Sequence, residues 1–309
     1  MRKFTFLLCF LMTGVAFSQT TLDVVRLNLA RTSMQDVEGD FEETDISNVN
    51  LEILYPTPLS SKTTLVTGLT VENTQIDNLF SLQGANFPNI FNSLEDDRLL
   101  MTRLNLGVKM KHSRKWTGNY VLLPKFASNF DGDLDNAFQF GAIAFMEMKK
   151  NSRRVYRFGM YSSTEEFGQI ITPLVGVYYR TKNRKFTLDA LLPIKMEANY
   201  YFSKKFALGA DLRTSVKSYF LNGYSQDLYA QEESIRFGLY ASYGLFKNQV
   251  LARIKAGFDT TDYGVYNTGD KVGAQVLTFQ VSGDDRNRLN AEFDSSFFVG
   301  LDLIYRVGL

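Results

Sequence analysis

The residues of this chain that could do chemistry begin with its single histidine, His112, in the run Lys111-His112-Ser113-Arg114-Lys115. A serine nucleophile needs a base within hydrogen-bond reach. Successive residues of an extended chain point to opposite faces, so His112 is badly placed to activate Ser113. We therefore expect a solvated turn histidine and no enzyme activity.

An acidic run, Asp131-Gly132-Asp133-Leu134-Asp135, resembles the start of a calcium-binding loop. Such a loop needs Gly at its sixth position and Glu at its twelfth, where this chain has Asn136 and Ala142. An acidic loop tip is the favoured interpretation, and a weak divalent-cation site is the alternative. One histidine and one cysteine, Cys9, are too few for a zinc site. We expect no metal and no cofactor.

Charged residues recur at alternate positions of several segments, as Arg253 and Lys255 do between Ala252, Ile254 and Ala256. Strand geometry places such charges on one face of a sheet, opposite the apolar residues. Carboxylates on this face are fewer, which predicts an excess of about five positive charges. The cations that we expect to line an interior and meet a solute are Arg103, Lys109, Arg157, Arg213, Lys217, Arg236, Arg253, Lys255 and Arg306.

The segments that carry these charges alternate polar and apolar residues and are separated by turn signals. Most are close to the ~9–11 residues that a tilted strand needs to cross a bilayer. We expect fourteen strands, with twelve as the alternative because Pro124 and Pro193 interrupt the pattern. The predicted strands are 22–34, 47–55, 63–73, 98–110, 117–127, 137–148, 155–163, 171–180, 186–192, 194–202, 206–219, 233–243, 249–258 and 295–309.

The last segment, Phe297 to Leu309, has an apolar residue at every second position. One face of this strand is therefore continuously apolar, and the other is mostly small or charged. A strand of a transmembrane barrel needs both faces, because one meets lipid and the other a polar interior. The pattern predicts an all-β, antiparallel, up-and-down transmembrane barrel.

The connections alternate between short basic turns and long acidic loops, a layout typical of bacterial outer-membrane barrels. An even number of strands returns both chain ends to the short-turn side, which we expect to be periplasmic. The short turns are Pro56–Lys62, Lys111–Trp116, Lys149–Arg154, Thr181–Lys185, Ser203–Lys205 and 244–248. The long connections are Gln35–Asp45, Thr74–Asp97, Ala127–Asn136, Thr164–Ile170, Phe220–Glu233 and Asp259–Asp294.

The N-terminus has the pattern of a secretory signal peptide, with a basic start, an apolar stretch and small residues before a cut near Ser18. We expect residues 1–18 to be removed and residues 19–309 to form the barrel. With 34 Lys and Arg against 33 Asp and Glu, the chain also lacks the basic excess of a nucleic-acid-binding protein.

Taken together, the terminal strand and the alternating segments resemble the outer-membrane β-barrels of Gram-negative bacteria, in particular families catalogued only as domains of unknown function. The resemblance covers residues 19–309 and departs at the last position, where such proteins most often have Phe and this chain has Leu309. It implies an outer-membrane location, contact with outer-membrane lipid and lipopolysaccharide, and insertion by the barrel-assembly machinery. It implies no activity.

A barrel of this size needs a plug or contains water, because fourteen strands enclose more space than side chains can fill. The apolar loop Thr74–Asp97 is the predicted plug, with Phe80, Phe87 and Phe91 as candidate constriction residues. We expect a passive or weakly anion-selective pore for small solutes. The alternative is a non-conducting barrel with a structural or surface-interaction role, and an outer-membrane lipid hydrolase ranks well below both.

Overall fold

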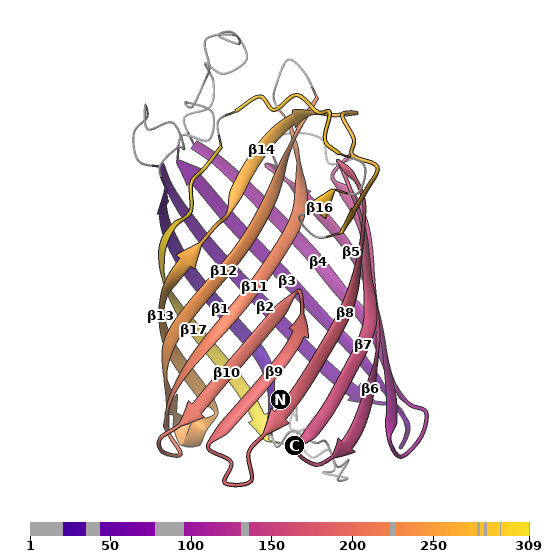
Figure 1. The fold of residues 1–309 in the computed structure, drawn as a ribbon, viewed down its shortest axis with the longest axis vertical. Helices are drawn as coiled ribbons and strands as arrows, with labels where there is room; N and C mark the ends of the chain where they lie inside the picture. Colours follow the sequence, from indigo (N-terminus) through magenta and orange to yellow (C-terminus); the bar gives the residue numbers. More distant parts are fainter. Residues whose placement is uncertain are drawn as a thin grey trace, which may run out of the picture.

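The computed structural model describes residues 21–34, 44–77, 96–130, 136–222, 227–276, 279–280, 283–290 and 292–308. In this part of the chain, fourteen strands form a closed wall in which each strand is antiparallel to the next and β17 pairs with β1 (Figure 1). The wall strands are β1 (Thr21–Met34), β2 (Thr44–Pro58), β3 (Thr63–Asp77), β4 (Asp96–Lys111), β5 (Trp116–Ser128), β6 (Phe138–Asn151), β7 (Arg154–Glu165), β8 (Gly168–Arg180), β9 (Phe186–Leu192), β10 (Lys195–Tyr201), β11 (Phe206–Leu221), β12 (Leu228–Leu245), β13 (Val250–Asp259) and β17 (Ser296–Gly308). The predicted up-and-down barrel of fourteen strands is confirmed, and the twelve-strand alternative is wrong.

Three further strands lie between β13 and β17: β14 (Asp262–Asn267), β15 (Ala274–Val276) and β16 (Phe279–Gln280). A short 3-10 turn, η1 (Phe246–Asn248), joins β12 to β13. The sequence predicted a long acidic loop over this part of the chain, and the strands within it are a correction.

The outer face of the wall is apolar and exposed. Ile254 and Leu239 are 72% and 60% exposed, and Phe297, Val299, Leu303 and Tyr305 of β17 alternate with the buried Phe298, Asp302 and Ile304. A continuous apolar surface of this extent is unfavourable in water and is what a barrel presents to lipid. Among the described residues, no helix is long and apolar enough to cross a membrane.

The short basic turns gather at one end of the barrel, which we call the short-turn end. Thr21 pairs with Gly308 there, so the first and last described residues meet at this end. Several of these turns use the same serine contact, in which the hydroxyl accepts hydrogen bonds from the backbone N–H groups two and three residues later. Ser60, Ser113 and Ser203 all make these bonds, at 3.0–3.2 Å.

The hairpin of β9 and β10 is much shorter than its neighbours (Figure 1). Strand β8 pairs with β9 only from Arg180 to Val175, and β11 pairs with β10 only from Ala207 to Arg213. Beyond these residues, towards the end of the barrel that carries the long loops (upper in Figure 1), β8 is no longer paired with β9 and β11 is no longer paired with β10.

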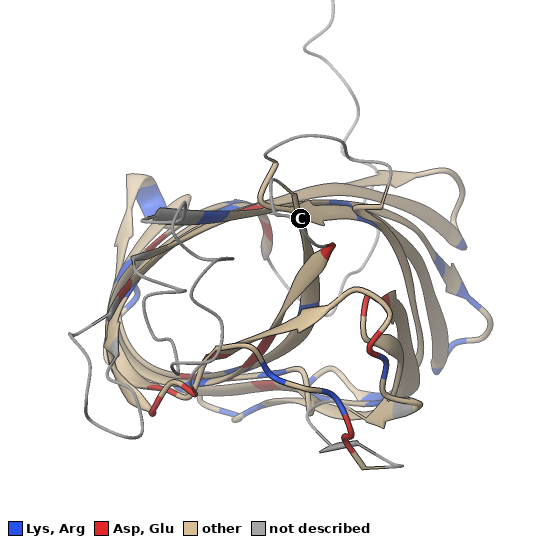
Figure 2. Ribbon diagram, turned by 90° about the horizontal axis from the view of Figure 1, so that it is seen from above, with Lys and Arg blue, Asp and Glu red and all other residues tan. Residues whose placement is uncertain are grey.

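The upper parts of β11 and β12 do not stay in the wall. Residues 216–221 and 228–232 are buried on both faces, and β14 adds to the edge of β12 beyond the point where β13 leaves it. Phe220 of β11 is paired with Ser128 of β5, on the opposite side of the barrel. Figure 2, the view from above, shows the chain crossing the interior. We call these three strand segments the partition.

Candidate functional site

The candidate site is a cavity of about 1360 Å³ inside the barrel. It reaches from the turns of the short-turn end, at Arg184 and Lys204, up to Glu232 and Tyr263 of the partition. The predicted cations that contribute to its lining are Arg103, Lys109, Arg157, Arg213, Lys217, Arg236, Arg253 and Arg306. Lys255 lies in the wall, 4% exposed, where its Nζ is 2.9 Å from Asp302 and also pairs with Asp211.

Most of these cations are held by carboxylates. The Arg253 guanidinium makes two hydrogen bonds to Glu197, of 2.8 and 3.0 Å, and lies 4.5 Å above the Tyr240 ring. The ion pairs elsewhere in the lining join Lys109 and Arg157 to Glu147, Arg157 to Asp189, Arg306 to Asp23, and Arg236 to Asp259. Ion pairs of this kind join different strands of the wall. Because the two charges of each pair cancel, they attract a solute only weakly.

Tyr240 depends on a glycine for its position. A Cβ on Gly209 would lie 2.4 Å from the Tyr240 ring, so the ring occupies the space that a side chain would take. Its hydroxyl then donates a hydrogen bond of 2.8 Å to Asn199.

Replacing Gly209 with Ala should therefore destabilise the barrel by about 1–3 kcal/mol, because the ring must leave its place between Asn199 and Arg253. Denaturant unfolding in lipid would measure the loss. The matched control is Gly141→Ala, where the nearest atom to the new Cβ is 3.3 Å away. Equal losses for both variants would contradict this role of Gly209.

A second set of cations has few partners. Lys195 and Arg213 face each other across β10 and β11, while Arg103 lies beside Thr70 and Glu52 across β4, β3 and β2. Arg213 reaches over the lumen to Glu52 at 3.7 Å, with their side chains 42% and 40% exposed. Arg103 Nη2 donates a long hydrogen bond of 3.4 Å to Thr70, and Lys195 has neither a hydrogen bond nor an ion pair among the described residues. We call Arg103, Lys195 and Arg213 the basic cluster.

The basic cluster has one carboxylate at its centre. Glu52 interacts electrostatically with Arg213, Lys195 and Arg103, and also with Arg26, while Lys195 interacts with Asp189 as well as with Glu52. The three cations of the cluster outnumber these two carboxylates, and Asp189 is also paired with Arg157, so the site keeps a net positive charge and is accessible from the cavity. Such a site can bind an anion or lower the barrier for an anion to pass.

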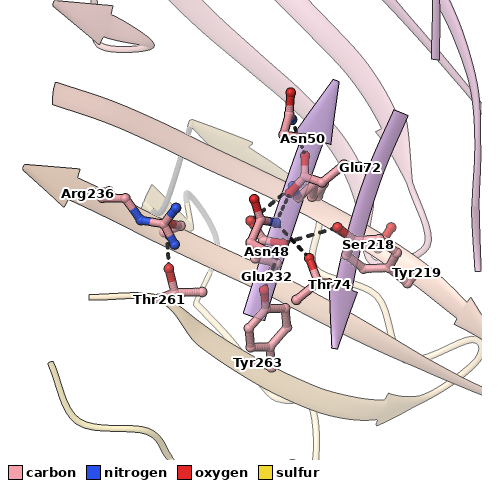
Figure 3. A network of polar contacts seen from close by, with 12 residues as sticks. Asn48, Asn50, Glu72, Thr74, Ser218, Tyr219, Glu232, Arg236, Thr261 and Tyr263 are labelled. Atoms are coloured by element: carbon pink, nitrogen blue, oxygen red, sulfur yellow. Dashed lines mark hydrogen bonds and ion pairs between the residues drawn. The ribbon is translucent and has the colours of Figure 1, made fainter. Parts of the chain in front are cut away.

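Above the basic cluster, a polar network joins the partition to the wall (Figure 3). Lys217 Nζ lies 2.6 Å from Glu72 and 3.1 Å from Glu232, and Asn48 and Asn50 donate to Glu72. The hydroxyls of Tyr219 and Tyr263 both donate to Glu232 at 3.2 Å. Lys217, predicted to meet a solute, is 7% exposed and fixes the partition instead.

The long-loop end of the barrel is filled by two apolar clusters, one on each face of the partition. On one face, Tyr219, Leu221 and Val265 pack with residues from β2 to β5 and with Leu289 and Phe293. On the other face, Val216, Tyr229 and Tyr266 pack with Phe167, Ile170 and Val272. Residues 283–290 are joined to β14 by the hydrogen bond that Leu289 N donates to Val265 O, 2.9 Å.

Arg286 covers the second of these clusters, which contains Tyr229 and Tyr266. Its guanidinium lies 3.9 Å over the Tyr266 ring and donates to Tyr229 Oη at 2.9 Å and Gln231 Oε1 at 2.6 Å. Burial disfavours the charged form of Arg286, but the hydrogen bonds with Asp284 and Tyr229 outweigh burial and raise its pKa above the ordinary value. The cation is therefore a fixed part of the closure.

The predicted constriction residues Phe80, Phe87 and Phe91 lie outside the described residues. The closure that the structure describes comes from the described residues between 260 and 293 and from the partition. Apart from residues 216–219, which it placed in a strand, the sequence placed these residues in long acidic loops, so it missed their role in closing the lumen.

Among the described residues of the wall strands, five interior charges were also missed. They are Asp23, Lys125, Glu165, Glu232 and Asp259, and four of the five are acidic, so the interior is closer to neutral than predicted. Glu165 and Glu232 were assigned to loops, although β7 and β12 extend through them. Lys125 follows Pro124, where the pairing of β4 with β5 is interrupted between Arg103 and Leu106 without a change of register.

The residues considered for catalysis and metal binding are placed as follows. Ser113 caps its turn, and the ring nitrogen Nε2 of His112 lies 3.1 Å from the Tyr120 hydroxyl. Residues 131–135 lie outside the described part of the chain. Within that part, no group of three or more His, Cys, Asp or Glu residues could hold a metal ion.

Comparison with known proteins shows no match among curated proteins. Among solved structures, the chain is similar to the COG4313 outer membrane channel from Pseudomonas putida F1, with 10% identity, a TM-score of 0.46, and coverage of 93% of this chain and 95% of that chain. It is also similar to the P. putida toluene transporter TodX, with 11% identity, a TM-score of 0.36, and coverage of 93% and 91%. A third is the NanC porin, with 9% identity, a TM-score of 0.33, and coverage of 89% and 98%. Such low identities and TM-scores assign no function.

A family model matches residues 80–261, which is more than half of the chain and extends from the second long connection to the start of β14. The matched part includes the short β9–β10 hairpin, the partition strands β11 and β12, and Arg103, Lys195 and Arg213. The chain therefore belongs to the family described as Domain of unknown function (DUF6268).

Proposed function

We propose that this chain is a barrel of the Gram-negative outer membrane that passes small anionic solutes through its lumen. In this proposal, residues 1–18 are an export signal, and the basic turns face the periplasm. The partners are outer-membrane lipid and lipopolysaccharide around the apolar belt, and the barrel-assembly machinery acting on the terminal strand. The fold and the exposed apolar belt support the location.

The observation that carries the proposal is the basic cluster. Arg103, Lys195 and Arg213 face the cavity with Glu52 as their shared carboxylate, while the other cations considered above are held in ion pairs. Because Arg213 reaches across the lumen to Glu52, a solute entering from the short-turn end must pass this group. Basic side chains at such a point favour negative solutes over positive ones.

The partition limits how solutes pass. The apolar clusters on its two faces fill the long-loop end, so the straight path along the barrel axis is obstructed. We therefore expect a small conductance, well below that of a wide water-filled porin.

Replacing Arg103, Lys195 and Arg213 together with Gln should shift the selectivity of the purified barrel from anions toward cations. Reversal potentials across a planar bilayer with a salt gradient would measure the shift, which we expect to be several-fold in the permeability ratio. Lys111→Gln, Arg114→Gln and Lys115→Gln remove the same charge from an exposed turn and serve as the matched control. A folded wild-type barrel that prefers cations would refute the proposal.

The second candidate is a non-conducting barrel with a structural or surface-interaction role. The packing at the long-loop end favours this candidate. Two apolar clusters and the hydrogen bonds of Arg286 hold the closing residues in place, as expected of a barrel that does not conduct. A wild-type barrel that conducts nothing, beside a plug-deleted barrel that conducts, would favour this candidate.

A further inference from the structure

The hydrogen-bonded wall of the barrel is interrupted above the β9–β10 hairpin, and we call this interruption the side opening. Strand β9 ends at Leu192 and β10 begins at Lys195, whereas β8 continues to Gly168 and β11 to Leu221. The hydrogen bond from Thr214 N to Ile194 O, 2.9 Å, is the last between this hairpin and β11. Above it, the described pairings leave residues 171–174 of β8 and 215–219 of β11 without a partner strand between them.

The residues at the tip of this hairpin are apolar, as expected for a turn in contact with hydrocarbon and not with water. It reads Leu192-Pro193-Ile194, and Leu192 is 43% exposed. Hairpin turns in water usually contain Gly, Asn, Asp or Ser, and the turns at the short-turn end of this barrel follow that rule with Ser113, Asn183 and Ser203. An apolar tip half-way up a lipid-facing wall places the side opening within the membrane.

The cavity reaches this opening. Ile194 at the tip, Thr214 and Val216 of β11, and Ile170 of β8 all contribute to its lining. Towards the long-loop end, the opening is limited by β15, which pairs with Gln169 and Ile170, and by the apolar cluster of Phe167 and Val272, against which Ile170 and Val216 pack. Apolar residues of the hairpin tip, β11 and β8 thus line the cavity at the level of the side opening, and we call them the rim.

The first charged residues of the lumen lie directly beside the apolar rim. Lys195 follows Ile194 directly in the sequence and is paired in register with Arg213 on β11. The basic cluster thus lies immediately inside an apolar opening that faces the membrane. A basic cluster beside an apolar rim is complementary to a molecule that has one anionic group and one alkyl chain.

We propose that the side opening and the basic cluster together bind a single-chain anionic amphiphile. Its charged head group is held by Lys195, Arg213 and Arg103, and its alkyl chain lies in the opening between Ile170, Ile194 and Val216. This inference rests on the proposed function, since it uses the same basic cluster, and adds to it the substrate class and a route between lumen and membrane.

The test uses the full-length mature barrel in lipid nanodiscs, titrated with dodecanoate in a calorimeter against empty nanodiscs. Acetate has the same head group without the chain, and dodecyltrimethylammonium has the same chain with the opposite charge. We expect dodecanoate to bind at least about tenfold more tightly than either, because burial of an alkyl chain and attraction to the basic cluster must act together. Similar affinity for dodecanoate and dodecyltrimethylammonium would overturn the proposal.

Variants of the rim locate the alkyl chain. Ile194→Trp and Val216→Trp should weaken dodecanoate binding by at least about tenfold, because an indole fills the opening. Ile254→Trp and Val299→Trp, the same substitutions on the exposed lipid face, are the matched controls and should bind as the wild type does. Folding of each variant is checked by its heat-dependent migration on a gel.

The outcomes separate the two proposals. If the wild-type barrel prefers anions in a planar bilayer but Ile194→Trp binds dodecanoate with unchanged affinity, the side opening is refuted and the anion channel stands. If the wild-type barrel shows no anion preference, the proposed function fails. Retained binding of dodecanoate after Lys195→Gln and Arg213→Gln would refute the head-group site.

Discussion

Replacing residues 260–295 with an Asn-Gly turn is expected to raise the conductance of the barrel by about tenfold or more, since it removes a plug that fills the long-loop end. Asp259 and Ser296 are paired in register across β13 and β17, so a two-residue hairpin turn can join them without disturbing the wall. The replacement removes β14 together with Leu289 and Phe293, and with them much of the packing that holds the partition inside the barrel. Single-channel recording in planar bilayers would measure the change.

A smaller change tests the same closure. Leu289→Asp places a charge in the buried apolar cluster, whereas Asn287→Asp places it in the same segment at an exposed position. We expect the first variant to raise conductance or open more often, and the second to behave as the wild type. Unchanged conductance in both Leu289→Asp and the turn replacement would mean that the segment does not obstruct passage.

Lysine in place of Leu239 or Leu303 should prevent correct assembly or destabilise the folded barrel by about 2–4 kcal/mol, the cost of a basic side chain on the lipid face near the bilayer midplane. Both residues are exposed on the outer face, and Leu303 is paired with Leu27 and Ala252 on its neighbours. Guanidinium unfolding in lipid vesicles would give the free energy of unfolding.

Ser215→Lys is the matched control, because Ser215 contributes to the cavity lining and a lysine there remains in a polar environment. Its effect on the free energy of unfolding should be much smaller. Comparable losses at Ser215 and Leu303 would mean that the outer face of the wall does not contact lipid.

The architecture of the wall was predictable because it depends on local information. Alternation of side chains has a period of two in any strand, and a barrel in a membrane converts that period into lipid-facing and interior residues. Leu301, Leu303 and Tyr305 could be placed outside and Asp302 and Arg306 inside from the sequence alone, and the structure agrees. The alternation also gave fourteen strands, including the short hairpin around Pro193.

The ends of the strands were less predictable. Glu165 and Glu232 lie beyond the predicted ends of their strands, because acidic stretches were interpreted as loops exposed to water. In the structure, Lys125 lies 2.7 Å from Glu165 and Lys217 lies 3.1 Å from Glu232, so each charge is buried with a partner. Pairing between distant strands removes the cost that makes an isolated buried carboxylate unfavourable.

The sequence by itself determined the fold class, the two faces of each strand and the set of cations that the barrel could place inside. Only the tertiary structure decided which of those cations keep their charge available to a solute. Arg253, Lys217 and Lys255 are neutralised by carboxylates from other strands, whereas Lys195 forms no ion pair among the described residues, and no periodicity along the chain carries that information. The partition and the side opening were likewise decided by the tertiary structure. A short hairpin leaves neighbouring strands without partners only when the whole wall is assembled, and the upper part of β11 lies inside the barrel with β12 and β14, where it closes the lumen.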